Sequence, residues 1–293
     1  MFLHRQELQF TSTPDKPDAV YARKLQEVLG GQYGEITIAM QYMFQGWNMH
    51  VPGKYRDLVF GIASEEIGHV EMLATMIAQL LEKSPLGITS DAVQDDPTVA
   101  AIVGGTDVQH AIVAGAGARP VDSNGNPWQG SYITGSGNLL ADFSQNAAAE
   151  MQGRVQVARL YHMIDDKGVR DLLAFLLARD TMHQNMWLAA VAELQEEGAE
   201  KLPAPSNFPQ SKEHTEVSYQ YLNFSDGAHA AEGRWAKGPS PDGNGEFTYH
   251  DGPTTSAPMP PPTHPDSRFY GTTELPNAVE KVAGAAQDAL NKE

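Results

Sequence analysis

The chain has 293 residues, of which 41% are apolar and 19% charged, so it can bury a large core and has the composition of a soluble globular protein. Its net charge of −17 and the lack of a basic stripe argue against nucleic acid as a partner. The absence of cysteine excludes disulfides, thiolate metal sites and cysteine nucleophiles. No apolar run reaches the ~20 residues of a membrane span and the N-terminus lacks the apolar region of a signal peptide, so we expect a cytoplasmic protein without a membrane partner.

Four long helices are predicted, in two consecutive pairs. The first covers residues 19–47 and the second covers residues 55–83, with the short link HVPGK between them. The third covers residues 138–166 and the fourth covers residues 169–197, separated by DDKG. Because short links join neighbouring antiparallel helices, each pair should form a helical hairpin.

A long crossover of residues 84–137 lies between the two hairpins. It is rich in Gly, Asp, Pro and Asn, and irregular connections of this length are uncommon in compact domains. Two helical hairpins joined by one long connection is the topology of ferritin-like bundles. We therefore predict an all-α fold for residues 1–198, a ferritin-like four-helix bundle.

The C-terminal tail, residues 199–293, differs in character because Pro, Gly, Ser and Asn recur in it, as in LPAPSNFPQS and APMPPPTHP. A short helix is predicted near Asn277–Leu290, and the remainder is predicted to be extended and mostly irregular. Such a tail cannot easily form a core of its own, so its aromatic side chains indicate that it packs on another surface. They are Tyr219, Tyr221, Phe224, Trp235, Phe247, Phe269 and Tyr270.

Acidic and histidine side chains interrupt the apolar faces of the four helices at matching positions. In the first pair, a lone glutamate precedes a second carboxylate by 31 residues, and in the second pair by 30 residues. A histidine follows the second carboxylate three residues later in both pairs, so the hairpins read as a repeat. The residues are Glu35, Glu66, His69, Glu150, Asp180 and His183.

This spacing predicts a site with two metal ions inside the bundle. Side chains three residues apart lie side by side on a helix, and about thirty residues suffice for a helix, a turn and the return to the same level. All six groups would then lie at one depth, where uncompensated carboxylates would be costly. One Glu from each of two helices, plus a carboxylate-x-x-His from each of the others, is the inward-facing dimetal pattern. Oxygen and imidazole ligands suit manganese or iron.

Individual residues of the pattern have simpler interpretations. A single Glu-x-x-His is common on exposed helix faces, so the prediction depends on the joint, matched spacing. Asp180 is one methylene shorter than Glu, which favours supporting a ligand or handling protons over binding metal. Tyr42, seven residues after Glu35, either donates a hydrogen bond to a ligand carboxylate or is an ordinary core tyrosine. Glu65 lies about 100° around the helix from Glu66 and either faces solvent or supports a ligand.

The four-helix region resembles the non-haem manganese catalases over roughly residues 21–197, on the motifs GGQYGEITIAMQY, EEIGHVEM, AAAEMQGRVQVARLY and DTMHQNMW. The crossover, the absence of cysteine and the Pro/Gly-rich tail fit the same family. Some members carry an arginine just before the third-helix glutamate; this chain has Ala149 there, so the role of that arginine is absent. The resemblance places Asp180 in the outer sphere and implies the metal ligands Glu35, Glu66, His69, Glu150 and His183.

The resemblance also implies the reaction, the disproportionation of hydrogen peroxide to water and dioxygen. Two manganese ions per chain would alternate between the Mn(II)2 and Mn(III)2 states. Peroxide loses or gains protons in each half-cycle, which calls for a base such as Glu66 or Asp180, and Tyr42 completes the candidate catalytic set. Family members are commonly hexamers whose C-terminal tail drapes over neighbouring subunits, so a homohexamer is expected.

Calcium is a further expectation from the resemblance, because some family members bind it at a subunit contact. The segment NFSDG, with Asn223, Ser225 and Gly227, would supply oxygen ligands together with Asp57. A second acid expected one turn after Asp57 is Gly61 in this chain. NFSDG can equally be a simple turn.

Two other functions are compatible with the same residues. A di-iron carboxylate oxidoreductase would use the same bundle, because Glu and His bind either metal. A ferritin-like metal-storage protein would use it for binding alone, although the long crossover and tail would be awkward on a closed shell. A structural role with a vestigial site is a third possibility, against which the complete ligand set argues.

Overall fold

The structure is a computed structural model, and it describes residues 4–51, 53–84, 109–198 and 212–260. The chain divides into two compact units, Met1–Gln210 and Ser211–Glu293, which we describe separately. No helix in these described ranges is long and apolar enough to cross a membrane.

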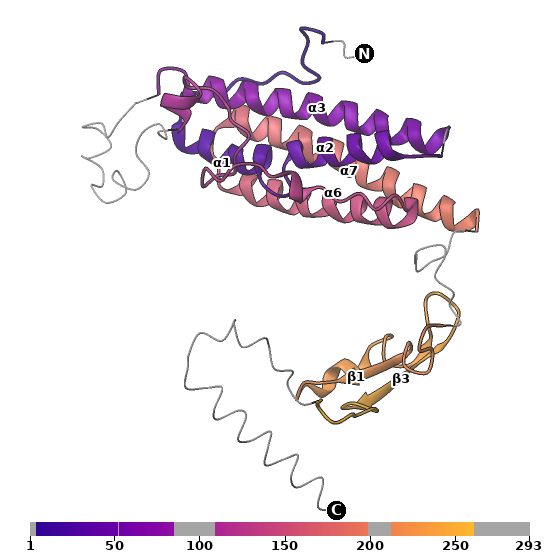
Figure 1. The fold of residues 1–293 in the computed structure, drawn as a ribbon. Coiled ribbons are helices and arrows are strands. Elements are labelled where there is room, and N and C mark those ends of the chain that lie inside the picture. The colour runs from indigo at the N-terminus through magenta and orange to yellow at the C-terminus, as the bar shows by residue number, and fades with distance from the viewer. Residues whose placement is uncertain (1–3, 52, 85–108, 199–211, 261–293) are drawn as a thin grey trace, which may run out of the picture. The chain divides into compact units, whose positions relative to one another are not determined.

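The first unit is a bundle of long helices lying side by side (Figure 1). Helix α2 packs along α3, α6 packs along α7, and α1 also packs on α3. The two predicted hairpins are therefore present, and the ferritin-like all-α fold is confirmed. The helices are α1 (Ala19–Gly30), α2 (Glu35–Asn48), α3 (Lys54–Leu81), α6 (Leu139–His162) and α7 (Lys167–Glu196).

The prediction of one continuous helix over residues 19–47 is wrong, because α1 ends at Gly30 and α2 begins at Glu35. The chain leaves the helix at Gly31, and the end of α1 packs closely against the crossover. A Cβ at Gly30 would lie 2.3 Å from the carbonyl oxygen of Val121, so only glycine allows this approach. The break places Glu35 in the first turn of α2, where the backbone N–H groups of the helix favour a negative charge.

Side-chain caps set the starts of α1, α6 and α7 close to the predicted positions. Asp18 accepts hydrogen bonds from the backbone N–H of Val20 and Tyr21 at the start of α1. Asn138 caps α6 and Asp166 caps α7 in the same way. These caps begin α6 and α7 within two residues of the expected starts, so the register that aligns the polar residues of the two hairpins is kept.

Two apolar clusters fill the bundle, one towards each end. On α3, the buried members of one cluster end at Ala63 and those of the other begin at Met72. On α7, the corresponding limits are Leu176 and Trp187. The stretch of two to three turns between these limits holds the carboxylates and histidines predicted from the sequence.

The described part of the crossover packs closely on the bundle. It contains a π-helical turn η1 (Gln109–Val113), a 3-10 turn η2 (Gly130–Tyr132) and a bridge between Val121 and Pro127. The side-chain amide of Gln26 donates to the carbonyl oxygens of Arg119 and Val121. Backbone groups of this long connection are therefore satisfied by the helices that it covers.

The second unit contains a small sheet of order β1-β3-β2, with β1 (Gln220–Asn223) parallel and β2 (Gly238–Pro239) antiparallel to β3 (Glu246–Asp251). A 3-10 turn η4 (Ala228–Glu232) follows β1. Among the described residues of this unit, Ala236 is the sole buried apolar side chain, whereas Phe224 and Trp235 are 77% and 60% exposed. The sheet was not predicted from the sequence, while the near-absence of a core was. The helix expected at 277–290 lies outside the described residues.

Candidate metal centre

The structure brings together all seven residues predicted for the site. They come from α2, α3, α6 and α7, and none is more than 5% exposed. Each pair of hairpin helices contributes its lone glutamate and its carboxylate-x-x-His to the same polar layer, as the matched spacing predicted. The seven residues are Glu35, Tyr42, Glu66, His69, Glu150, Asp180 and His183.

Glu66 is at the middle of the layer. Its Oε2 lies 2.7 Å from Nδ1 of His69, and its Oε1 lies 2.6 Å from Nδ1 of His183. Oε2 of Glu35 lies 3.7 Å from Nδ1 of His69, and Oε1 of Glu150 lies 4.0 Å from Nδ1 of His183. The layer therefore has two similar halves, each with one histidine and one lone glutamate, and they share Glu66.

The donor atoms of this layer fit metal ions better than they fit one another. Both oxygens of Glu66, both nitrogens of His69 and of His183, and Oδ1 of Asp180 are buried without a hydrogen-bond partner in the ranges that the structure describes. The short contacts of Glu66 with the two rings are thus not aligned as hydrogen bonds. Ligand atoms of these four residues all lie within 4.8 Å of one another. Orphaned buried groups of this kind are costly unless a cation satisfies them.

The electrostatics of the layer lead to the same conclusion. Burial, and then the neighbouring charge of Glu66, raises the pKa of Glu35 to about 8. Burial also raises the pKa of Glu150 and of Asp180. Burial alone would lower the pKa of His183, but its contact with Glu66 raises it to about 9. Bound cations would displace these protons and leave four carboxylates ionised in the core.

Tyr42 supports the second half of the layer. Its hydroxyl donates to Oε1 of Glu150 at 2.6 Å and accepts from Nε1 of Trp187 at 3.2 Å. The rings of Tyr42 and Trp187 also pack with their centroids 4.9 Å apart. Tyr42 therefore makes the contact with a predicted ligand carboxylate that the sequence allowed, and Trp187 helps to fix its orientation.

A small cavity reaches the layer from the side of α6. It has a volume of about 10 Å³, roughly that of one water-sized sphere, and it is bordered by Glu35, Glu150 and Asp180. Ala149 and Gly153 line it as well, so the small side chain at position 149 helps to keep this space open.

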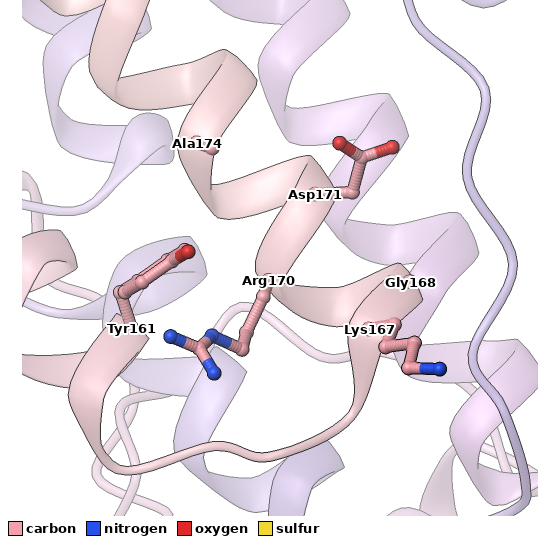
Figure 2. A pocket seen from close by; sticks show the side chains of 6 residues that line it. All are labelled: Tyr161, Lys167, Gly168, Arg170, Asp171 and Ala174. Carbon is pink, nitrogen blue, oxygen red and sulfur yellow. The ribbon is translucent and has the colours of Figure 1, made fainter.

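A larger hollow of about 570 Å³ lies at the start of α7 (Figure 2). Figure 2 shows that Tyr161, Lys167, Arg170 and Asp171 line it. Asp171 precedes Asp180 by nine residues on the same helix, about 13 Å along its axis. This hollow is therefore separate from the polar layer, and it lacks the convergent carboxylate and imidazole groups found there.

The residues expected to bind calcium do not form a cluster within either unit. Asp57 is an exposed residue in the first turn of α3. In the second unit, Oδ1 of Asn223 accepts from the backbone N–H of Ser225, and Oγ of Ser225 accepts from the N–H of Gly227. NFSDG thus forms the simple turn that the sequence also allowed, and calcium binding stays a prediction.

Sequence reasoning missed several residues that support the layer. Glu65, left open between a solvent-facing and a supporting role, contacts Nε2 of His183 at 3.0 Å and is paired with Arg179. A buried amide cluster of Gln41, Gln45 and Asn146 links α2 to α6. Asn146 lies one turn before Glu150 on the same apolar face of α6. A second polar residue on that face could have indicated that Asn146 belongs to the site.

Comparisons with known proteins agree with this geometry. The sequence model of the family described as manganese containing catalase matches residues 1–284. A manganese catalase of Bacillus subtilis (strain 168) is 55% identical over 249 residues, which cover 85% of this chain and 90% of that protein. A manganese catalase of Lactiplantibacillus plantarum is 42% identical over 92% of this chain and 98% of its own length.

A solved structure is also similar, the crystal structure of KatB, a manganese catalase from Anabaena. It matches with a TM-score of 0.65 and 26% identity, over 86% of this chain and all of that chain. The fold, the buried layer of carboxylates and histidines, and the sequence similarity thus lead to one assignment, and this chain belongs to the manganese-containing catalase family.

Proposed function

We propose that this chain converts two molecules of hydrogen peroxide to two of water and one of dioxygen at a pair of manganese ions. The observation that carries the proposal is the polar layer of unpaired carboxylate and imidazole atoms, buried in a chain of the manganese catalase family. Oxygen and nitrogen donors without thiolate suit manganese. The proposed ligands are Glu35, Glu66, His69, Glu150 and His183.

The two halves of the layer suggest how the ligands divide. Glu66, with one oxygen towards each histidine, would help to hold both ions. Glu35 would join His69 at one ion, and Glu150 would join His183 at the other. When bound, the manganese pair supplies two-electron redox chemistry and Lewis acidity. The side chains of the protein would hold protons and admit peroxide.

Asp180 is the first candidate for proton handling. One peroxide gives up two protons and two electrons to become dioxygen, and the other takes them up to become two waters. Protons must therefore be held between the two half-reactions. Asp180 borders the small cavity, and its Oδ1 has no hydrogen-bond partner within the described ranges, so it can accept a proton there and return it. Glu66 is the second candidate base.

Tyr42 and the apolar clusters have supporting roles in this proposal. By donating to Oε1 of Glu150, Tyr42 keeps that carboxylate in one orientation. The clusters above and below the layer exclude bulk water and strengthen the electrostatic interactions inside it. The cavity beside the layer holds about one water-sized sphere, so it excludes larger reductants.

Replacement of the shared carboxylate tests the assignment. We expect Glu66→Ala to lose bound manganese and to release no measurable oxygen from peroxide, because both halves of the layer depend on Glu66. Glu71→Gln is the matched control, since Glu71 lies on the same helix and pairs with His4 near the surface. If the unmodified chain contained iron and released no oxygen from peroxide, the di-iron oxidoreductase would be favoured instead. Full activity of Glu66→Ala would contradict the proposed site.

A hexamer is part of the proposal, with residues 199–293 packing on neighbouring subunits. Its support is the second unit, whose described residues bury few apolar side chains and expose Phe224 and Trp235. Light scattering of the full chain, and of a chain ending at residue 198, measures this directly. We expect a hexamer for the first and a smaller species for the second.

Two further expectations are kept as proposals. Calcium bound through Asp57, Asn223, Ser225 and Gly227 would be detected by metal analysis after growth with calcium, and Asp57→Asn should abolish it. A cytoplasmic location would be tested by fractionation of cells.

A further inference from the structure

Glu65 lies on the side of the two imidazole rings opposite to Glu66. Oε2 of Glu65 is 3.0 Å from Nε2 of His183, and Oε1 is 3.8 Å from Nε2 of His69. The two rings are stacked, with centroids 5.6 Å apart and an angle of 24° between their planes. A single carboxylate therefore faces the outer nitrogens of both histidines, while Glu66 faces both inner nitrogens.

We propose that Glu65 is a positioning residue for both ligand histidines, aligning their Nδ1 atoms with the metal pair through contacts at Nε2. The inference rests on the proposed ligand set and goes beyond it, because Glu65 contacts no metal in the proposal. A ring that binds metal through Nδ1 must carry its proton on Nε2, and a carboxylate facing Nε2 selects that tautomer. Oε2 of Glu65 would do so for His183 at 3.0 Å and Oε1 for His69 at 3.8 Å; neither contact is aligned as a hydrogen bond in this structure.

Glu65 is itself held by donors from two other parts of the chain. Arg179, on α7, donates from Nε at 2.6 Å and from Nη2 at 3.3 Å. Gln9, in the N-terminal segment, donates from Nε2 at 2.7 Å. A carboxylate held by three hydrogen bonds from two residues has little freedom to rotate, so it can hold two rings in one arrangement.

The position of Glu65 separates its role from that of a buried ligand. Its side chain is 22% exposed, whereas those of His69 and His183 are fully buried. Its negative charge is offset by Arg179 at the surface, so it adds acceptor oxygens to the histidines without adding an unpaired charge to the core. Arg179 therefore holds Glu65, and Glu65 in turn contacts the two imidazole rings.

Glu65→Gln tests the proposal because it keeps the size of the side chain and removes one acceptor. The amide has a single oxygen, so it can accept from one ring, and its NH2 group would face the N–H of the other. We expect its affinity for Mn(II) to fall about 10- to 100-fold, the range found when supporting groups of metal ligands are removed. Glu65→Asp, which keeps both oxygens, should recover part of the loss.

The measurement is titration of the metal-free full chain with Mn(II), followed by the electron paramagnetic resonance signal of the free ion. The spectrum of bound Mn(II) should also change in Glu65→Gln and remain unchanged in the control Glu71→Gln. Equal affinities and spectra for Glu65→Gln and Glu71→Gln would overturn the positioning role. If the unmodified chain bound no Mn(II), the proposed function would fail instead, so the two failures are distinguishable.

Discussion

The buried amide cluster beside the metal layer allows a quantitative prediction for Asn146→Ala. Asn146 is fully buried; its Nδ2 donates to Oε1 of Gln45 at 2.7 Å, and its Oδ1 accepts from the Nε2 atoms of Gln41 and Gln45. Gln45 also donates to the carbonyl oxygen of Thr134, and Gln41 accepts from the N–H of Thr134. The cluster thus joins α2, α6 and the end of the crossover.

The expected loss of stability follows from the groups that the alanine would leave behind. Nε2 of Gln41 and Oε1 of Gln45 would lose their described partner, Asn146, and each unpaired buried group costs about 1–3 kcal/mol. Together the two groups lower the free energy of unfolding by about 2–6 kcal/mol, and the small void lowers it further. Glu150, one turn further along α6, would be held less firmly.

Urea denaturation followed by circular dichroism, at equal protein concentration and with saturating Mn(II), measures this loss. Asn185→Ala is the matched control, because Asn185 is exposed on α7 and its Nδ2 donates to the carbonyl oxygen of Thr181 in the same helix. Its effect should stay within about 0.5 kcal/mol. If Asn146→Ala were no more destabilising than Asn185→Ala, the cluster would not hold the crossover on the bundle.

Three further predictions concern the layer and the helix break. Asp180→Asn should keep the wild-type manganese content but lower oxygen release by about 10²–10⁴-fold, and loss of the metal would show that Asp180 is a ligand instead. Removal of manganese with a chelator should lower the melting temperature, because bound cations would satisfy the unpaired buried atoms of the layer. Added Mn(II) should restore it. An unchanged melting temperature would contradict a role of the metal in stability. Gly30→Ala should destabilise the protein by about 1–3 kcal/mol through its clash with the backbone of Val121. Gly61→Ala, at an exposed position of α3 where the added Cβ meets no described neighbour outside its own helix backbone, should be neutral or slightly stabilising. Equal effects of the two substitutions would show that the approach of Gly30 to Val121 does not require glycine.

The grouping of the carboxylates and histidines in one layer could be predicted from the sequence because helical spacing is local. The three residues from Glu66 to His69 and from Asp180 to His183 determine that each pair shares a helix face. The hairpin geometry then follows from two short links, and it brings Glu35 and Glu150 to the same depth. The helical period and the two short links were therefore sufficient to predict which carboxylates and histidines lie together.

The break between α1 and α2 could not be predicted from the same period. The chain leaves the helix at Gly31, and the neighbouring Gly30 packs on Val121, about ninety residues away in the sequence. Three glycines within five residues, at positions 30, 31 and 34, were the local signal.

The contacts of Asn146 and Glu65 around the layer could not be predicted from helical spacing either, because their partners are distant in the chain. Asn146 is 105 residues from Gln41, and Glu65 is 114 residues from Arg179. A sequence shows that such side chains are polar, but only the packing of the helices shows what each contacts. The small sheet of the second unit is a similar case, since its strands are short and its turns are rich in Gly and Ser.

Anomalous diffraction at the manganese absorption edge, from crystals of the manganese-loaded chain, tests the central claim most directly. We predict two peaks in each chain on either side of the Glu66 carboxylate, one beside His69 with Glu35 and the other beside His183 with Glu150. A single peak, or peaks away from this layer, would contradict the dimanganese centre.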